Sequence, residues 1–285
     1  MKKTLSRYGK WALVTGGSSG IGLAFARELA ATGHNLILVA RGIATLNNSA
    51  KDLAATYRIE VQTIALDLTK SGASAELYEQ TKDKNPGLVI LSAGMETTGH
   101  FTKITPAAHQ SLIDLNIQAP AELARLFGAD MVARGRGGIV FLSSLFGYQG
   151  VPLVANYAAS KAYILALGEA LHVEMKPQGV DVLVVAPGLT DTDMPAQMPV
   201  NFSKMPITLH KPQKVARVGL KALGHKATVV PGLLNKIYAF ENRFIPRLWP
   251  TRLFGFLIRN ALHKDKKAEL LNSKGSHHKA VRNAS

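Results

Sequence analysis

The sequence predicts one α/β domain of the doubly wound type, in which helices cover both faces of a parallel sheet of about seven strands. Short apolar runs alternate with longer amphipathic stretches, and the first run leads into a glycine-rich loop. Several runs are apolar at every position, as in Leu36-Ile37-Leu38-Val39-Ala40, which is typical of strands buried on both faces. The strict alternation indicates a Rossmann-type fold, with ligands outside the carboxyl ends of the strands.

The expected elements follow this alternation along the chain. The expected strands are 11–15, 35–40, 61–66, 88–92, 138–143, 181–186 and 227–230. The expected helices are 20–32, 43–57, 72–83, 106–134, 155–176 and 211–223. Residues 8–232 would form the Rossmann domain. Within it, 189–210 breaks the pattern with three prolines and three methionines and no clear periodicity. We interpret this segment as a mobile lid, because loops of this length are usually functional or disordered.

Charge is distributed unevenly along the chain. The net charge is +15, yet residues 1–201 contain 17 Lys/Arg and 16 Asp/Glu, whereas residues 202–285 contain 17 and 3. The first two thirds therefore resemble an ordinary neutral enzyme. The absence of cysteine excludes disulfides, thiolate metal sites and a cysteine nucleophile, and no metal site is expected. Neither a signal peptide nor a membrane span of about 18–20 apolar residues is visible, so a cytoplasmic location is expected.

The glycine-rich loop is the first candidate binding motif. The first expected strand runs into Thr15-Gly16-Gly17-Ser18-Ser19-Gly20-Ile21-Gly22, and a helix follows. Glycines allow a tight turn and close approach of the backbone, and the helix N-terminus offers unpaired N–H groups to a pyrophosphate. The loop therefore predicts nucleotide binding.

Arg41 follows the second expected strand, where the fold brings the adenosine ribose. An acidic residue there would hydrogen-bond the ribose hydroxyls of NAD; this chain has Ala40-Arg41-Gly42 instead. A guanidinium group can pair with a 2′-phosphate. A solvated arginine at a loop is the alternative, and we favour NADP(H) over NAD(H).

Tyr157 and Lys161 open the helix after the fifth expected strand, with i, i+4 spacing that places both side chains on one face. A nearby cation stabilises phenolate and would pull the tyrosine pKa down from about 10. The preceding strand ends in Ser143-Ser144, where a hydroxyl could hydrogen-bond a substrate oxygen.

Taken together, these motifs resemble the short-chain dehydrogenase/reductase family over about Lys10 to Gly232. The motifs are Thr15–Gly22, Asp67-Leu68, Ser92-Ala93-Gly94, Asn116, Ser143-Ser144, Tyr157–Lys161, and Pro187-Gly188 followed by Thr190 and Thr192. One departure is that the family often has Asn-Asn-Ala-Gly where this chain has Leu91-Ser92-Ala93-Gly94. The side-chain amide that would brace the fourth strand is absent.

The resemblance implies a catalytic set of Asn116, Ser144, Tyr157 and Lys161. Ser144 is selected over Ser143 because the family places its serine thirteen residues before the tyrosine. Tyr157 would be the general acid/base and Ser144 would orient the substrate oxygen. Lys161 would hold the nicotinamide ribose and lower the Tyr157 pKa, and Asn116 would support a proton-relay water. Asn116 as a polar residue on a helix surface is the alternative.

The predicted cofactor site combines the glycine loop, Arg41 and residues that the resemblance adds. Asp67 would meet the adenine, although it could instead cap a helix. The complete set is Gly16, Ser18, Ser19, Gly20, Ile21, Gly22, Arg41, Asp67, Leu68, Ala93, Gly94, Tyr157, Lys161, Pro187, Gly188, Thr190 and Thr192.

These expectations define an NADP(H)-dependent oxidoreductase that reduces a ketone or aldehyde to an alcohol, or runs the reverse reaction. Met95, Leu145, Phe146 and the methionine-rich lid favour an apolar substrate, although such residues are also ordinary packing. The alternative is a catalytically silent NAD(P)-binding or redox-sensing protein of the same fold.

Residues 233–285 would form a basic helical extension and a disordered tail. Within 252–264, Leu253, Leu257 and Ala261 form one row and Phe254, Ile258 and Leu262 an adjacent one, with Arg252, Arg259 and His263 elsewhere. Such a basic amphipathic helix can lie on a membrane surface, here through 243–267. Packing on its own domain and a homo-oligomer interface are the alternatives. Nucleic acid is not expected, because no aromatic stacking surface accompanies the basic residues.

Overall fold

The computed structural model describes residues 5–241 and 244–263. Their core is one parallel sheet with the strand order β3-β2-β1-β4-β5-β6-β7. The strands are β1 (Trp11–Thr15), β2 (Asn35–Ala40), β3 (Val61–Ala65), β4 (Leu88–Leu91), β5 (Gly137–Leu142), β6 (Val180–Val185) and β7 (Thr228–Val229). The chain order reverses between β1 and β4, and crevices that bind ligands form at such switch points. The predicted seven-stranded, doubly wound fold is confirmed.

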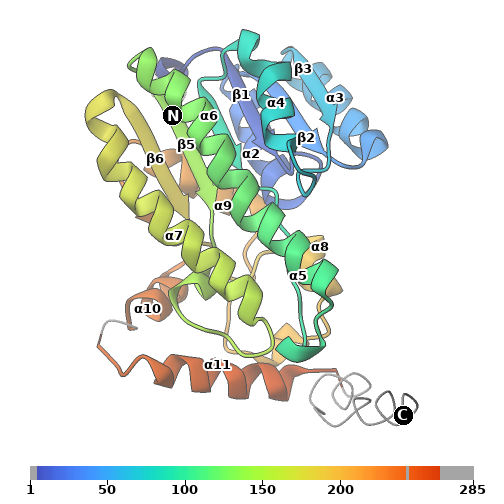
Figure 1. Ribbon diagram of the computed structural model, residues 1–285, viewed down its shortest axis with the longest axis vertical. Helices are drawn as coiled ribbons and strands as arrows, with labels where there is room; N and C mark the ends of the chain where they lie inside the picture. The colour runs from blue at the N-terminus through green and yellow to red at the C-terminus, as the bar shows by residue number, and fades with distance from the viewer. Residues whose placement is uncertain (1–4, 242–243, 264–285) are drawn as a thin grey trace, which may run out of the picture.

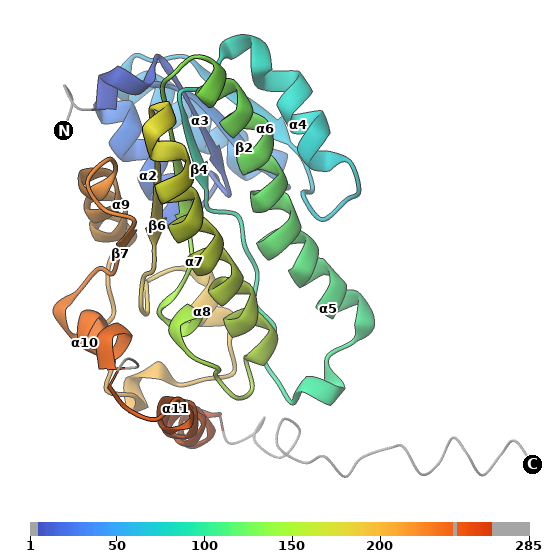
Figure 2. The same cartoon turned by 60° about the vertical axis from the view of Figure 1, so that its left-hand side comes forward.

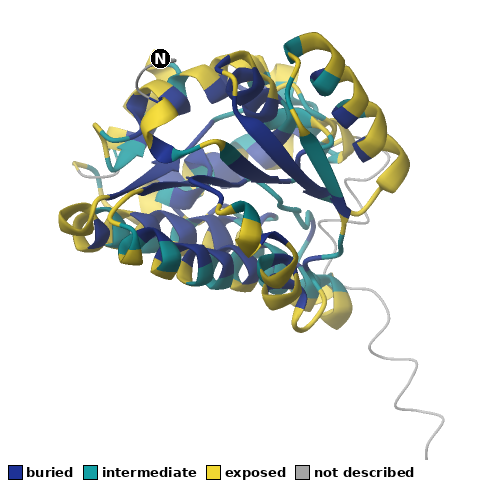
Figure 3. Ribbon diagram, turned by 90° about the horizontal axis from the view of Figure 1, so that it is seen from above, coloured by how far each residue is buried: buried dark blue, intermediate teal, exposed yellow. Residues whose placement is uncertain are grey.

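Helices cover both faces of this sheet (Figures 1 and 3). One layer contains α2 (Gly20–Ala31), α3 (Ile43–Tyr57) and α9 (Pro212–Ala222), and the other contains α4 (Ala73–Thr81), α6 (Ala119–Ala133) and α7 (Ala155–Met175). Successive strand residues point to opposite layers: Val14 packs in the first core cluster and Leu13 in the second. This double burial explains why the strands carry apolar residues at every position.

The helix expected over 106–134 is interrupted. The structure has α5 (Pro106–Ile113), a π-helical turn (Asp114–Gln118) and then α6. Pro120 has no N–H and cannot donate to the carbonyl of Asn116, as an α-helix would require. The backbone changes register instead, and the N–H of Ala119 donates to the carbonyl of Asp114. Because Pro120 is visible in the sequence, this interruption could have been predicted.

The segment 189–210 and the C-terminal extension pack together at one end of the molecule. The segment contains α8 (Asp193–Gln197) and a short turn, Phe202–Lys204. The extension contains α10 (Leu233–Glu241) and α11 (Leu248–Ala261). Figures 1 and 2 show both helices at the end of the molecule toward which the strands' carboxyl ends point.

The inner face of α11 holds the segment 189–210 in place. Phe254 and Ile258 are buried in one cluster with Val200 and Met205. Two backbone hydrogen bonds join the same parts, from the Asn201 N–H to the Ala261 carbonyl (2.7 Å) and from the His263 N–H to the Pro199 carbonyl (3.1 Å). One face of the amphipathic helix therefore packs on its own domain. The disordered tail expected from Ser273 onward lies outside the described residues.

Candidate active site

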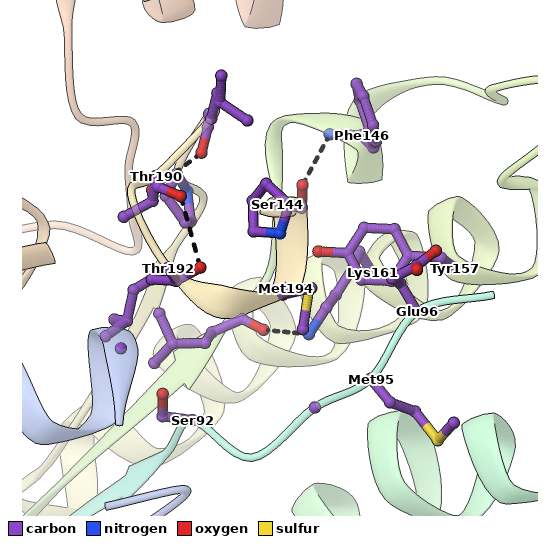
Figure 4. A pocket seen from close by; sticks show the side chains of 18 of the residues that line it. Ser92, Met95, Glu96, Ser144, Phe146, Tyr157, Lys161, Thr190, Thr192 and Met194 are labelled. Atoms are coloured by element: carbon purple, nitrogen blue, oxygen red, sulfur yellow. Dashed lines mark hydrogen bonds between the residues drawn. The ribbon is translucent and has the colours of Figure 1, made fainter. Parts of the chain in front are cut away.

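A cavity of about 570 Å³ opens at the carboxyl edge of the sheet (Figure 4). It collects most of the residues that the sequence singled out, from segments far apart in the chain. The predicted residues that line it are Gly16, Ser19, Gly20, Ile21, Gly22, Arg41, Ala93, Gly94, Ser144, Tyr157, Lys161, Pro187, Gly188, Thr190 and Thr192. Ser18, Asp67, Leu68 and Asn116 are not part of its lining.

The glycine loop forms a cradle of bare backbone at one end of this cavity. A Cβ atom on Gly22 would lie 2.2 Å from the carbonyl oxygen of Gly16, so only glycine fits this contact. Ser19 caps α2 without a side-chain hydrogen bond, which leaves the N–H groups of the first turn open to an acceptor. This cradle fits a pyrophosphate, whose charge the positive helix end favours.

Arg41 lies at the end of β2, exposed and in the cavity wall. It has no ion pair with any residue that the structure describes. Its guanidinium is therefore available to an anionic ligand beside the cradle.

Asp67 closes a local turn. Its carboxylate accepts hydrogen bonds from the Thr69 N–H (3.1 Å) and the Thr69 hydroxyl (2.9 Å). The backbone bond contributes most to a lowered Asp67 pKa, with the Arg41 charge a smaller contribution. Asp67 does not cap a helix, because the next helix, α4, begins at Ala73 after Gly72. The described structure does not test a contact with adenine.

The first turns of α7 present Tyr157 and Lys161 opposite the end of β5. Lys161 is buried, and its Nζ donates to the Leu142 carbonyl at 2.9 Å. The two serines before it differ: Ser143 donates to the Lys161 carbonyl (2.7 Å), whereas the Ser144 oxygen accepts from the Phe146 N–H (3.2 Å). The Ser143 hydroxyl therefore joins β5 to α7, whereas the Ser144 hydroxyl lies within hydrogen-bonding reach of Tyr157.

Burial controls the acidity of the two α7 side chains. It raises the pKa of Tyr157 to about 12, against a lowering contribution from the Ser144 hydroxyl and with a further rise from the Glu96 charge. Burial lowers the pKa of Lys161 to about 8. Desolvation dominates the Tyr157 shift, and its further contributions come from Ser144 and Glu96 rather than from Lys161, so the expected lowering of the Tyr157 pKa by Lys161 stays a prediction.

Asn116 is buried and points away from solvent, so the surface alternative for this residue is wrong. Its Nδ2 donates to the Met95 carbonyl (2.8 Å) and to the Ser160 hydroxyl (3.1 Å), and its Oδ1 accepts from the Met95 N–H (2.9 Å). The π-helical turn brings the amide into this position. Asn116 thus ties α7 to the loop after β4. It braces this loop, in which the asparagine that is frequent in the family is absent.

Glu96, Asn235 and Phe254 line the cavity and were not among the predicted site residues. Glu96 lies with Tyr157 and Lys161 on one side of the cavity (Figure 4). Burial raises the Glu96 pKa, and its carboxylate accepts a hydrogen bond from Thr98. Asn235 of α10 and Phe254 of α11 also line the cavity. The position of Glu96, two residues after Gly94, was a usable signal; the other two follow only from the tertiary fold.

The chain belongs to the short-chain dehydrogenase/reductase family, since the family model for short chain dehydrogenases matches residues 10–201. It is 31% identical to a 7beta-hydroxysteroid dehydrogenase of Clostridium sardiniense over 85% of this chain and 92% of that protein. It is 34% identical to the human inactive hydroxysteroid dehydrogenase-like protein 1, over 70% of this chain and 60% of that one.

Among solved structures, the chain is similar to a short-chain dehydrogenase of Sphingobium yanoikuyae in complex with NADPH. The TM-score is 0.74 with 29% identity, over 79% of this chain and 88% of that chain. The protein is accordingly an oxidoreductase of a family that acts on hydroxyl and carbonyl groups with a nicotinamide dinucleotide.

Proposed function

We propose that the protein is an NADP(H)-dependent reductase of an apolar ketone or aldehyde, in which Tyr157 is the general acid and, in reverse, the general base. The observation that carries this proposal is one continuous cavity. Thr192, which packs beside Gly20 of the glycine cradle, lies on one side of it and Tyr157 lies on the other, with Ser144 and Lys161 between them.

The nicotinamide supplies the hydride when NADP(H) is bound. The side chains of this chain would then handle the proton and the substrate oxygen. The Ser144 hydroxyl, whose oxygen is already held by the Phe146 N–H, would donate to the carbonyl oxygen and orient it. Tyr157, with a pKa raised to about 12, is protonated at neutral pH and would deliver its proton to that oxygen.

Lys161 and Asn116 support this pair. One N–H of the Lys161 ammonium donates to Leu142, and the others would bind the nicotinamide ribose. Tyr157 would regain its proton from solvent after each turnover, along the groups that Lys161 and Asn116 hold in place. We propose that Asn116 holds the loop after β4 and supports a relay water. Gly94 lies between the Asn116 amide and Lys161, since a Cβ on Gly94 would be 3.3 Å from Asn116 Oδ1 and 3.4 Å from Lys161 Nζ. The absence of that Cβ leaves space between the two side chains.

Arg41 supports the preference for NADP(H), because its guanidinium lines the cavity without an ion pair to any described residue and could pair with a 2′-phosphate. The substrate end of the cavity supports an apolar substrate. Its wall includes Leu145, Phe146, Met194, Met198, Phe202, Ile207 and Phe254. Four of these, with Pro195, lie in 189–210, so we propose that this segment is a lid over the substrate.

The alternative of a silent nucleotide-binding protein is favoured by one observation, the similarity to a human protein named inactive. A Tyr157→Phe variant separates the two functions. We expect kcat for carbonyl reduction by NADPH to fall by about 10³-fold, with NADPH binding, followed by nicotinamide fluorescence, unchanged.

Tyr163→Phe is the matched control, because Tyr163 lies on the same helix with 44% of its surface exposed. It should retain full activity. Equal rates for Tyr157→Phe and the wild type, across a panel of ketones and aldehydes, would contradict the catalytic assignment. Binding of NADPH without turnover of any carbonyl by the wild type would favour the silent alternative.

A further inference from the structure

The end of the molecule formed by α10 and α11 exposes an unusual concentration of large apolar side chains. Of the fourteen large hydrophobic residues exposed among the described residues, nine lie between 233 and 256. They are Leu233, Leu234, Ile237, Phe240, Phe244, Leu248, Trp249, Leu253 and Phe256. Leu233 and Phe244 are 78% and 73% exposed. We call this set the C-terminal apolar surface. Exposed apolar side chains gathered at one end of a molecule often mark an interaction site.

Helical spacing organises these side chains into outward faces. On α11, Trp249, Leu253 and Phe256 follow i, i+4, i+7 spacing and are exposed, whereas Phe254, Ile258 and Ala261 follow the same spacing and are buried. The buried residues form the inner face of α11, which packs on the domain. The exposed residues form an outer apolar face, which no other part of the described structure covers.

The same pattern occurs on α10. Leu233, Ile237 and Phe240 follow i, i+4, i+7 spacing and are exposed, while Asn235 and Ala239 are buried. The Phe240 ring continues to the Phe244 ring, with centroids 5.0 Å apart. Both helices lie at the same end of the molecule in two views (Figures 1 and 2).

Positive charge accompanies this apolar surface. Residues 233–263 contain five Lys/Arg and one acidic residue, Glu241. Arg252 and Arg259 lie on the exposed side of α11, and neither forms an ion pair with any described residue. The sequence after α11, residues 264–285, adds six Lys/Arg and two acidic residues.

We propose that the C-terminal apolar surface docks on an anionic lipid bilayer, with α10 and α11 lying in its interface. Apolar and aromatic side chains beside unpaired arginines are the features of an interfacial helix, and anionic lipids attract each nearby Lys or Arg. A second copy of the chain fits this surface less well, because a symmetric contact would bring two equally basic faces together.

The docked orientation has a consequence for the substrate, which rests on the proposed function. The helices that carry the outer apolar faces also close the cavity, through Asn235 of α10 and Phe254 of α11. The inner face of α11 packs on the lid segment. Docking therefore places the substrate end of the cavity against the bilayer, and the substrate is an apolar ketone or alcohol that partitions into lipid.

Co-sedimentation with vesicles tests the docking itself, without any turnover. The full chain should bind vesicles of phosphatidylcholine with phosphatidylglycerol and bind phosphatidylcholine alone more weakly, and added salt should weaken the anionic binding. Phe256→Ser should reduce binding by about tenfold or more, because the Phe256 ring would no longer leave water for the apolar part of the bilayer. Val173→Ser is the matched control, because Val173 on α7 is 72% exposed, and it should bind as the wild type does.

A charge-reversed pair tests the electrostatic part. Arg252→Glu with Arg259→Glu should abolish the preference for anionic vesicles. Lys51→Glu with Arg125→Glu, two exposed positions on α3 and α6, makes the same change in net charge and should preserve it. Brominated lipids should quench Trp249, and the quenching should persist in Trp11→Phe, which removes the only other tryptophan.

Two outcomes would overturn the proposal. One is no binding to anionic vesicles at low salt. The other is a dimer in light scattering that Phe256→Ser dissociates, because a second copy would then cover the surface. NADPH binding by Phe256→Ser, unchanged from the wild type, excludes misfolding as the cause of any loss.

The substrate consequence has its own readout. Reduction of a long-chain ketone held in anionic vesicles should slow in Phe256→Ser, whereas reduction of a water-soluble ketone should not. Equal rates for wild type and variant on the vesicle-held ketone would overturn the lipid-borne substrate. Loss of all carbonyl reduction with vesicle binding intact would instead contradict the proposed function.

Discussion

The two ends of the cavity are built by different means. The nucleotide end consists of backbone at strand ends, with Gly16, Gly22 and Gly94 bringing bare chain to the surface. The substrate end consists of side chains from distant segments, among them Phe146, Met194 and Phe254. Backbone geometry allows few substitutions, whereas a side-chain wall can change without loss of the fold. We therefore expect substitutions at the nucleotide end to be costly and substitutions at the substrate end to be tolerated by the fold.

Replacing Gly22 with Ala should produce the largest effect and confine it to the nucleotide end. The new Cβ would come 2.2 Å from the Gly16 carbonyl oxygen, so the loop would have to move away from the position that fits a pyrophosphate. We expect NADPH affinity, measured by fluorescence titration, to fall by about 100-fold or more, since several backbone hydrogen bonds of about 1–3 kcal/mol each would be lost.

Gly42→Ala is the control for the nucleotide end. A Cβ there would meet only the Thr45 hydroxyl oxygen, at 4.0 Å, so affinity should change little. If both glycine variants bound NADPH as tightly as the wild type, the cradle would not be the phosphate site.

Phe254→Ala should affect the substrate end in the complementary way. The side chain is 1% exposed, and its ring contacts Phe146 and Tyr238 with centroids 5.7 and 5.9 Å away. Truncation leaves a void and should lower the free energy of unfolding by about 3 kcal/mol, measured by denaturant titration. KM for apolar ketones should rise, while NADPH affinity stays the same.

Phe256→Ala separates this packing role from the outer face of the same helix. Phe256 is 63% exposed, so unfolding and KM for water-soluble ketones should match the wild type. A loss of stability as large as that of Phe254→Ala would show that α11 does not pack as the structure has it.

Arg41→Ala tests a side-chain contact within the nucleotide end, where the glycines contribute only backbone. Removing one charge-assisted contact to the 2′-phosphate should raise KM for NADPH by about tenfold or more, at about 1.5–3 kcal/mol for such a bond. KM for NADH should not change. Arg125→Ala, at an exposed position on α6, should leave both constants unchanged, and equal losses for NADH and NADPH would contradict the 2′-phosphate role.

The same contrast explains what the sequence could predict. Local rules set the strands, the glycine loop and the first turns of α7, and these agree with the structure. Pro120 explains the interruption of the helix at Asp114–Gln118. The prediction of one continuous helix followed the periodicity of the apolar residues and gave this proline too little weight. The rise in the Tyr157 pKa could not be predicted from i, i+4 spacing, because it depends on desolvation by the assembled cavity.

The C-terminal extension shows where local rules end. Its periodicity indicated an amphipathic helix, yet α11 has two apolar faces, and only the fold determines which one packs inward. Asn235 and Phe254 reach the cavity because the chain returns to the carboxyl edge of the sheet after β7. No spacing in the sequence encodes that return.

Glu96→Gln should produce the smallest effect and test the boundary between the two ends. The Glu96 charge raises the Tyr157 pKa, so its removal should lower that pKa. In alcohol oxidation Tyr157 must lose its proton, and activity rises with pH through the Tyr157 pKa. That rise should move to lower pH in Glu96→Gln. In carbonyl reduction Tyr157 must keep its proton, and the alkaline loss of activity should move the same way. Glu174→Gln, at an exposed position on α7, should leave the pH dependence of both oxidation and reduction unchanged. An unmoved profile would mean that the Glu96 carboxylate does not act on Tyr157 during turnover.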